Sequence, residues 1–410
     1  MTRELANKMR TRISDGLRVI FAGGGTGGHI MPGAATAQAL CELLPGSRCL
    51  FMCTDRRSEL HCRHAIAGFE LAEIPAARWR GALQKLRFAA TSLAAARRSI
   101  EIFSNFRPHV LVGLGGYSCV VPVLLARALG VPTMIFESNA VPGRVIRALA
   151  PLVDCVQLQW PTTKRRLRAR HVLICGNPVR ACLLQGDRRS ARARLGLHPD
   201  RCTLLATGGS QGALALNRLL ISALQYVAGE GATSEPRGLQ VLHLTGSEHL
   251  AEARGYAPPP GLTYQARAFV TQMEDAYAAA DLVLSRAGGS TLAELTAVGL
   301  PSILIPYPHA SDNHQSANAA LLAEAGAAVV LSQRKLTPRK LGALIADLVH
   351  HPERIASMAA RATALGRPDA AHVVAAQLAS MAGFKTIHDH DTAPQDYQGT
   401  SEPLSASRAA

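Results

Sequence analysis

Gly23-Gly24-Gly25-Thr26-Gly27-Gly28-His29 follows a short apolar run and opens a helix-like segment, and Gly208-Gly209-Ser210-Gln211-Gly212 repeats that arrangement in the second half of the chain. A glycine-rich loop lets backbone amides approach a phosphate because no Cβ intervenes, and the N-terminus of the following helix adds partial positive charge. Two strand, loop and helix units of this kind predict a nucleotide-handling enzyme with a cleft between its halves.

Apolar runs alternate with longer helix-like stretches around both loops. The runs lie at 17–22, 48–54, 110–113, 133–136 and 153–158, and again at 202–206, 239–245, 262–268, 281–284 and 301–305. This βαβα alternation is typical of parallel sheets. A hydrophobic content of 48% with only 4% aromatic residues favours helices packed on parallel strands. The sequence therefore predicts an α/β fold.

The length of 410 residues indicates two domains, because a single core rarely grows so large. We expect a basic N-terminal extension at 1–16, an N-terminal domain at 17–180, a C-terminal domain at 181–384 and a disordered tail at 385–410. The stretch 337–381 predicts two helices, and we allow the last helix to pack back on the N-terminal domain.

The net charge of +15 lies in the first half of the chain. Residues 1–180 hold 25 Lys and Arg against 10 Asp and Glu, so the remainder is neutral. A large anionic partner should therefore dock on the first half, and nucleic acid and an anionic membrane both qualify. The segment 78–103 interleaves arginines with Trp79, Leu83 and Leu86, which fits a lipid interface or an ordinary amphipathic helix.

Targeting and metal-binding signals are weak. No apolar run reaches the length of a spanning helix, and residues 1–16 lack an apolar signal-peptide stretch, so we expect a cytosolic protein. The nine cysteines are scattered, which favours reduced thiols. His61, Cys62 and His64 form an isolated cluster, and Asp389-His390-Asp391 lies in the tail, so we expect no metal site.

Two loops of the second half are candidates for ligand binding. Gly288 and Gly289 follow an apolar strand and precede Ser290 and Thr291, so open amides, hydroxyls and a helix dipole would favour a diphosphate there. Thr291 and Glu294 would instead fit a capping box. The polar loop 306–315 could read sugar hydroxyls, although an N-capping loop would look similar.

Seven motifs in one order resemble the MurG family, the bacterial N-acetylglucosaminyltransferases that complete the lipid-linked peptidoglycan precursor. They are Gly23 to His29 followed by Pro32-Gly33, Gly113-Leu114-Gly115-Gly116-Tyr117, Glu137-x-Asn139-x-x-Pro142-Gly143, Gly176-Asn177-Pro178-Val179-Arg180, Gly208 to Gly212, Arg286-Ala287-Gly288, and Asp312 to Gln315. The resemblance implies a GT-B fold, in which two Rossmann-like domains face each other across a cleft. The second domain would hold UDP-N-acetylglucosamine (UDP-GlcNAc), and the first would hold the lipid acceptor.

The resemblance also implies roles for individual residues. Phe269, Val270 and Arg286 would surround the uracil, Gly289, Ser290, Thr291 and Ser210 would meet the diphosphate, Glu294 would bind the ribose, His314 and Gln315 would read the GlcNAc, Asn139 would line the cleft, Arg180 would face phosphate charge, and Thr26, Gly27, Gly28 and Gln211 would complete the substrate-binding set. Where the family commonly reads His-Glu-Gln-Asn, this chain has Phe136-Glu137-Ser138-Asn139, which predicts altered rather than lost binding.

The implied reaction is an inverting displacement at the anomeric carbon by the 4-hydroxyl of MurNAc in lipid I, with UDP as leaving group and no cofactor. His29 is the candidate base, because a neutral imidazole accepts a proton near pH 7. It could instead position the acceptor or cap its helix. Since lipid I is a membrane lipid, we expect the protein at the cytoplasmic face of the inner membrane, bound to the anionic surface rather than to nucleic acid.

Four other interpretations remain open on sequence alone. A nicotinamide-dependent oxidoreductase would need G-x-G-x-x-G, whereas the glycines at 23–25 are contiguous. A tubulin-type polymer shares Gly-Gly-Gly-Thr-Gly but not the Gly28-His29 ending. A non-enzymatic membrane or nucleic-acid module would explain the charge but not the loops of the second half. A related GT-B enzyme with another lipid or natural-product acceptor is the strongest alternative.

Overall fold

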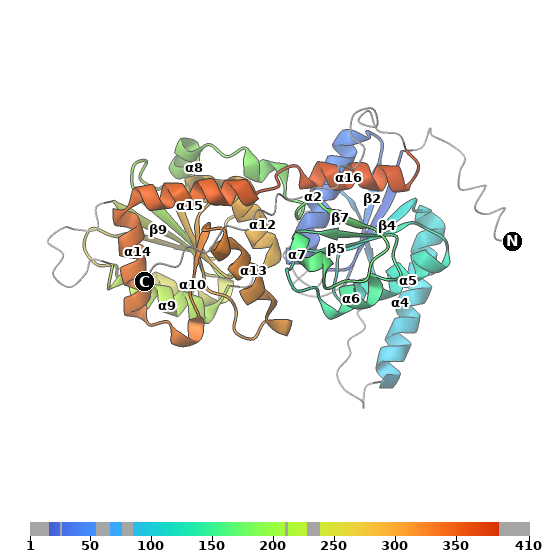
Figure 1. Ribbon diagram of the computed structural model, residues 1–410, viewed down its shortest axis with the longest axis horizontal. Helices are drawn as coiled ribbons and strands as arrows, with labels where there is room; N and C mark the ends of the chain where they lie inside the picture. The colour runs from blue at the N-terminus through green and yellow to red at the C-terminus, as the bar shows by residue number, and fades with distance from the viewer. Residues whose placement is uncertain are drawn as a thin grey trace, which may run out of the picture.

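The computed structural model describes residues 16–24, 27–54, 66–75, 85–209, 212–227 and 238–384, with side chains at all of them except 27 and 85–89. The chain forms two lobes, each built on one parallel sheet with helices on both faces (Figure 1). The strand order is β3-β2-β1-β4-β5-β6-β7 in the first lobe and β10-β9-β8-β11-β12-β13 in the second. The predicted α/β fold with two Rossmann-like domains is confirmed.

The first lobe contains most of the N-terminal elements. Its strands are β1 (Arg18–Ala22), β2 (Arg48–Cys53), β3 (Glu70–Glu73), β4 (Val110–Gly113), β5 (Thr133–Glu137), β6 (Cys155–Leu158) and β7 (Val172–Ile174). Its helices are α2 (Gly27–Leu43), α4 (Lys85–Phe106), η3 (Tyr117–Cys119), α5 (Val120–Ala128), α6 (Arg144–Leu149) and α7 (Pro161–Lys164).

The second lobe repeats this pattern. Its strands are β8 (Cys202–Thr207), β9 (Leu239–Leu244), β10 (Thr263–Arg267), β11 (Leu282–Ser285), β12 (Ser302–Leu304) and β13 (Ala328–Val330). The helices that follow the first lobe are η4 (Ala181–Leu184), α8 (Arg188–Leu195), α9 (Leu214–Leu224), η5 (Ser247–His249), α10 (Leu250–Arg254), α11 (Met273–Ala279), α12 (Gly289–Val298), η6 (Ser311–Asn313), α13 (His314–Glu324), η7 (Gln333–Lys335), α14 (Pro338–His350), α15 (Pro352–Leu365) and α16 (Ala370–Met381).

The central strands are buried on both faces. Along β1, Val19 and Phe21 belong to the core beneath α2 and α16, while Ile20 and Ala22 belong to the core beneath α4 and α5. Successive side chains of a strand point to opposite faces, so each central strand supplies both layers of helices. This double burial explains why the apolar runs are continuous rather than alternating. All ten predicted runs correspond to strands.

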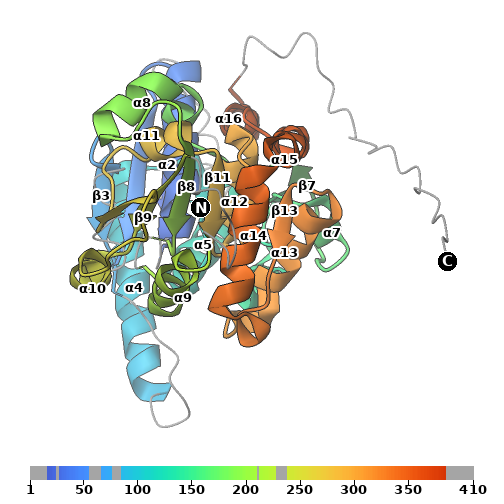
Figure 2. The ribbon, with the colours of Figure 1, turned by 90° about the vertical axis from the view of Figure 1, so that its left-hand side faces the viewer.

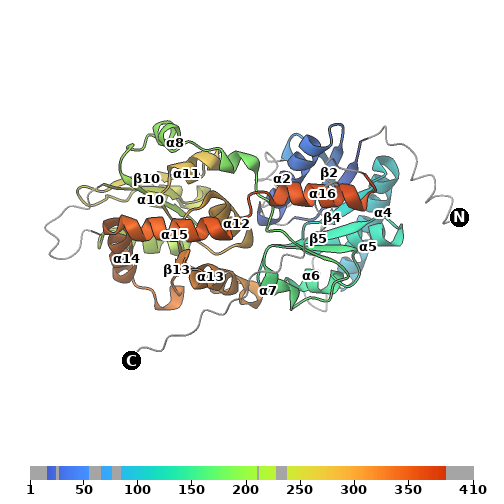
Figure 3. The same ribbon diagram turned by 45° about the horizontal axis from the view of Figure 1, so that its top comes forward.

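The C-terminal helices correct one prediction, because 337–381 forms three helices rather than two. Pro352 lacks a backbone N–H and starts α15 directly after His351, and Gly366 ends α15. The chain then returns to the first lobe, where Val374 and Leu378 of α16 pack in the core beside α2 (Figure 3). The two lobes are therefore joined by two chain crossings, at 175–187 and at 366–370.

A buried polar cluster stabilises the second lobe. His243 on β9 is 1% exposed, with Nδ1 2.7 Å from the Tyr264 hydroxyl and Nε2 3.1 Å from Asn217 Oδ1. Because Asn217 Oδ1 can only accept, Nε2 carries the proton and Nδ1 accepts from Tyr264. Burial lowers the pKa of His243 to about 4. The folded protein therefore holds this ring in its neutral form at neutral pH.

The pKa difference predicts acid sensitivity. An unfolded histidine takes up a proton near pH 6.5, whereas His243 in the folded protein does so only near pH 4, so stability falls across that interval as pH decreases. We expect a loss of about 3 kcal/mol from this residue between pH 7 and pH 4. Urea unfolding of the wild type and of His243→Gln at both pH values checks it, and an equal pH dependence in the two proteins would contradict it.

Candidate functional site at the interlobe interface

Loops that follow β1 and β5 in the first lobe meet loops that follow β11 and β12 in the second. Ligands of open α/β folds bind at the carboxyl ends of the strands, where such loops gather. Ser290 Oγ, at the start of α12, donates to the carbonyl oxygen of Gly28 at 2.5 Å and accepts from Asn177 Nδ2 at 3.3 Å. We call the residues where the lobes touch, around Gly28, Ser138, Gly289 and Ser290, the interlobe interface.

His29 lies in the first turn of α2 and is partly buried. Its ring packs on Gly115, where an added Cβ would approach His29 Cδ2 to 2.8 Å. Gly115 also has a positive φ of 103°. A residue with a side chain at 115 would thus be strained and would displace the imidazole. The glycine motif after β4 therefore shapes the position of His29.

The electrostatic environment keeps His29 neutral. Burial lowers the pKa of His29, and the neighbouring His314 lowers it further because two positive rings would repel each other. His314 Nδ1 lies 2.7 Å from the carbonyl oxygen of Ser311, so Nδ1 of His314 carries a proton. Nε2 of a neutral His314 ring can then accept a hydrogen bond. A neutral His29 is chemically able to take a proton from a hydroxyl at pH 7.

Glu137 organises the loop after β5. Its Oε1 accepts from the backbone N and from Nδ2 of Asn139, both at 2.8 Å, and its Oε2 accepts from the N of Gly143 at 2.6 Å. Burial raises the pKa of Glu137, and these hydrogen bonds and His314 oppose that rise. The carboxyl group therefore holds Asn139 in place and caps α6 through Gly143.

The two departures from the family pattern have different environments. Phe136 is buried among apolar side chains of the first-lobe core, including Met134. Ser138 lies at the interlobe interface, where a Cβ added to Gly289 would approach the Ser138 carbonyl oxygen to 2.5 Å. With its amide oriented to satisfy both acceptors, Gln159 donates to Ser138 O at 2.7 Å and Gly289 O at 3.1 Å. The backbone of the first lobe at Ser138 therefore lies directly against the backbone of the second lobe at Gly289.

The start of α12 excludes the capping-box alternative. Gly288 is the N-cap residue, with φ −70° and ψ 141°, so Thr291 is already the third helical residue and does not cap. Glu294 accepts a hydrogen bond from the buried Tyr277 hydroxyl at 2.8 Å. Burial raises the pKa of Glu294, while Tyr277 and the charge of Arg180 oppose that rise. Arg180 therefore lies within electrostatic reach of Glu294.

The loop after β12 is held from several sides. Arg286 Nη1 donates to Ile305 O at 2.9 Å, and its guanidinium lies 5.6 Å from the centre of the Tyr307 ring. Tyr307 N donates to Gln315 Oε1 at 2.8 Å. Asp312 has a positive φ of 51° and accepts from Arg147 Nη2 of the first lobe at 2.7 Å. This loop therefore reaches across to the first lobe.

The structure brings some of the predicted site residues together. Gly28, His29, Asn139, Gly289, Ser290 and His314 gather at the interlobe interface, and Gly27 begins α2. Phe269, 68% exposed, and Val270 follow β10, and Val270 packs on the core of the second lobe. Thr26, Ser210, Gln211, residues 78–84, the His61 cluster, Asp389–Asp391 and residues 1–15 lie outside the described residues.

Sequence reasoning missed three side chains that support this site: Gln159, Tyr277 and the bridging role of Asn318. Gln159 and Tyr277 lie in apolar surroundings that resemble core segments, and no local pattern distinguishes them. Asn318 stands three residues after Gln315 on α13, one helical turn from a predicted ligand residue. This spacing could have predicted that Asn318 faces the same side of the helix as Gln315.

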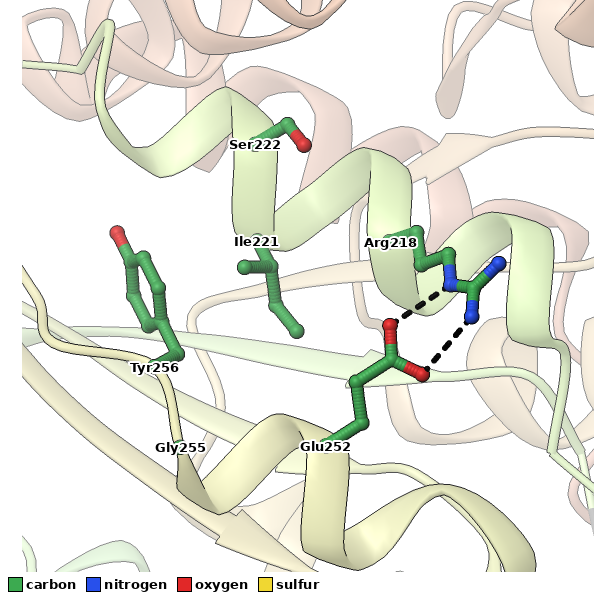
Figure 4. A pocket seen from close by; sticks show the side chains of 6 residues that line it. All are labelled: Arg218, Ile221, Ser222, Glu252, Gly255 and Tyr256. Atoms are coloured by element: carbon green, nitrogen blue, oxygen red, sulfur yellow. Dashed lines mark hydrogen bonds and ion pairs between the residues drawn. The ribbon is translucent and has the colours of Figure 1, made fainter.

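A shallow depression on the second lobe is a separate feature (Figure 4). It measures about 460 Å³ and is lined by Arg218, Ile221, Ser222, Glu252, Gly255 and Tyr256. Arg218 Nε and Glu252 Oε1 already pair at 2.7 Å. None of the predicted site residues lines it, so it contributes nothing to the interlobe site.

Family models match both lobes. The glycosyltransferase family 28 N-terminal domain matches residues 19–157, and the glycosyltransferase family 28 C-terminal domain matches residues 203–374. A relative from Anaeromyxobacter sp. strain Fw109-5 is 39% identical, over 88% of this chain and 92% of its own length. It is named UDP-N-acetylglucosamine--N-acetylmuramyl-(pentapeptide) pyrophosphoryl-undecaprenol N-acetylglucosamine transferase. A protein of the same name from Moorella thermoacetica is also 39% identical, over 87% of this chain and 97% of its own.

Solved structures show the same architecture. The crystal structure of Acinetobacter baumannii MurG is 27% identical, covers 89% of this chain and 99% of its own, and has a TM-score of 0.68. The match to the UDP-GlcNAc 2-epimerase of Neisseria meningitidis covers 89% of this chain and 99% of the epimerase chain, with a TM-score of 0.59. At 10% sequence identity it shows the fold alone.

Substitution of the interface glycine tests the backbone contact. Gly289→Ala would place a methyl group against the Ser138 carbonyl, so we expect the free energy of unfolding to fall by about 1–3 kcal/mol. Gly288→Ala is the matched control, because its Cβ would meet only Thr291 Oγ1 at an ordinary 3.7 Å. Denaturant unfolding of both variants checks it, and equal stability of the two would show that the lobes do not touch at Gly289.

Proposed function

The chain belongs to glycosyltransferase family 28, and on that premise we propose that it transfers GlcNAc from UDP-GlcNAc to the 4-hydroxyl of MurNAc in lipid I, which forms lipid II for peptidoglycan synthesis. The resemblance to the MurG family is confirmed by relatives named for this transferase activity, matched over nearly their whole length, and by the structure of Acinetobacter baumannii MurG. Membership in this family is incompatible with the oxidoreductase and tubulin-type interpretations. The relatives favour the lipid I acceptor over another lipid or natural product.

One contact carries the mechanism. The 2.5 Å hydrogen bond from Ser290 Oγ to Gly28 O sets the N-terminus of α12 beside the residue that precedes His29. The positive end of α12, with Gly289, Ser290 and Thr291, would stabilise charge that develops on the departing UDP. A neutral His29 on the opposite lobe would accept the proton of the attacking hydroxyl. The departing UDP and the attacking hydroxyl would then lie on opposite sides of the anomeric carbon, as inversion requires.

The remaining assignments complete the proposed site. Phe269, Val270 and Arg286 would surround the uracil, Glu294 would bind the ribose, His314 and Gln315 would read the sugar, Arg180 would balance phosphate charge, and Thr26, Gly27, Gly28, Asn139, Ser210 and Gln211 would complete the substrate contacts. The exposed ring of Phe269 suits stacking on a base. Burial of Glu294 suits a hydrogen-bonding role better than a charge-pairing one.

The proposal is tested by following labelled sugar. Radiolabelled UDP-GlcNAc is supplied with a lipid I analogue, and separately with unrelated polyprenyl and natural-product acceptors. We expect label in the lipid I analogue alone. Transfer only to an acceptor without MurNAc would overturn the proposed substrate.

The role of His29 predicts a pH dependence. A base must be unprotonated, so kcat/KM should fall on the acid side with an apparent pKa below the ordinary histidine value. His314→Ala removes a neighbouring positive charge, so the pKa of His29 should rise and the acid limb should move to higher pH. A pH profile of both proteins checks it. An acid limb that stays in place in His314→Ala would contradict the coupling of the two rings, and an acid limb that persists in His29→Ala would exclude His29 as the base.

The first lobe offers a surface for the membrane partner. Helix α4 buries Ile102, Phe103 and Phe106 in the core, yet leaves Leu93 73% and Ile100 51% exposed on another face. Figure 2 shows α4 extending beyond the rest of its lobe. Helices in the described ranges are all too short or too polar to cross a bilayer. We propose that this face, which belongs to the segment 78–103, rests peripherally on the anionic cytoplasmic surface of the inner membrane.

Charge placed on that face should weaken membrane binding. We expect the double variant Leu93→Glu with Ile100→Glu to bind vesicles of anionic phospholipid several-fold less than the wild type, because apolar insertion is lost and like charges repel. Tyr226→Glu, at an exposed apolar position of the second lobe, is the control. Vesicle sedimentation measures the bound fraction, and unchanged binding of the double variant would move the membrane surface elsewhere.

A further inference from the structure

Asn318 is a buried polar side chain to which the proposed reaction assigns no role. It is 0% exposed and belongs to α13, a helix at the side of the second lobe that faces the first (Figure 1). Its Oδ1 accepts from the backbone N of Ala140 at 2.8 Å. Its Nδ2 donates to Asn139 Oδ1 at 3.0 Å and to Ala287 O at 3.1 Å. The amide therefore has partners at both ends.

These partners belong to two loops of different lobes. Asn139 and Ala140 follow β5 in the first lobe, where Glu137 fixes them. Ala287 follows β11 in the second lobe and immediately precedes Gly288 and Gly289, the start of α12. One side chain thus contacts the loop that bears Asn139 and the loop that leads to the proposed diphosphate site.

Burial makes this contact selective for one arrangement of the lobes. Separation of the lobes would remove both first-lobe partners, and an amide without partners is costly wherever water cannot replace them. The Arg147 to Asp312 pair also crosses between the lobes, but both side chains are partly exposed and solvent screens the pair. Packing within α13 alone would need only an apolar residue at 318, as at its buried neighbours Ala319 and Leu322.

We propose that Asn318 is a positioning residue: it couples the donor loop at 287–289 to the acceptor-side loop at 137–143 and so stabilises the closed arrangement in which His29 and Asn139 face the donor. It touches neither substrate in this proposal. The part that concerns turnover rests on the proposed transferase activity, whereas the coupling of the loops does not.

The test uses Asn318→Ala, which removes all three hydrogen bonds, and Asn318→Asp, which keeps the acceptor and removes both donors. Asn105→Ala, at an exposed position of α4, is the matched control. Amide hydrogen exchange of the peptide that contains Ala140 is measured by mass spectrometry in the full-length protein. Equilibrium binding of UDP and steady-state transfer to a soluble lipid I analogue are measured alongside.

We expect the Ala140 amide to exchange at least about tenfold faster in Asn318→Ala, and kcat to fall by about tenfold or more with UDP affinity within about threefold of the wild type. A role confined to the second-lobe core would leave the first-lobe peptide unchanged. Wild-type exchange and kcat in Asn318→Ala would overturn the proposal. If both variants unfolded and lost UDP binding, Asn318 would be a core residue of its own lobe, and the proposal would again fail. Absence of transfer by the wild type would refute the activity and leave the exchange result to decide the coupling.

Discussion

The structure depends on the close approach of two backbones at the interlobe interface. Gly289 can lie against the Ser138 carbonyl only because it lacks a Cβ, and Ser290 then reaches Gly28. The N-terminus of α12 carries the partial positive charge of the helix. Without that approach, this charge and the imidazole of His29 would belong to separate lobes and could not act on one substrate.

Buried polar groups then fix how the lobes meet. Glu137 holds Asn139 in the loop after β5, and Asn318 of the second lobe donates a hydrogen bond to that Asn139. Gln159 donates to the carbonyl oxygens of both Ser138 and Gly289. Such groups are poorly tolerated without partners, so they favour one arrangement more strongly than apolar packing would. The return of α16 to the first lobe adds a covalent and apolar link, which limits how far the lobes can separate.

Much of the fold could be predicted because the signals are local. All ten predicted runs form strands, and the central strands are apolar throughout because they are buried on both faces, whereas β10 lies at a sheet edge and is only partly buried. The strands β3, β7 and β13 escaped prediction because each lies at a sheet edge and is short, and β3 carries two glutamates in four residues. The stretch 337–381 was expected to form two helices, but Pro352 starts an additional one directly after His351, because proline fits the first position of a helix.

The candidate site was only partly predictable. Gly28 of the first glycine loop, His29 and the start of α12 have local signatures, and the structure brings them together. The contacts that hold these residues in place have no local signature. Asn318 and Ala140 are 178 residues apart in the chain, and Gly28 and Ser290 are 262 residues apart. Sequence spacing carries no information about such pairs, which arise only when both sheets have formed and the lobes have docked.

The most direct test of this account is a crystal structure of the protein with UDP-GlcNAc bound. We expect the diphosphate at the amides of Gly289, Ser290 and Thr291, with the anomeric carbon of the sugar turned towards His29 of the opposite lobe. A donor bound away from the start of α12, or with its anomeric carbon facing away from His29, would contradict it.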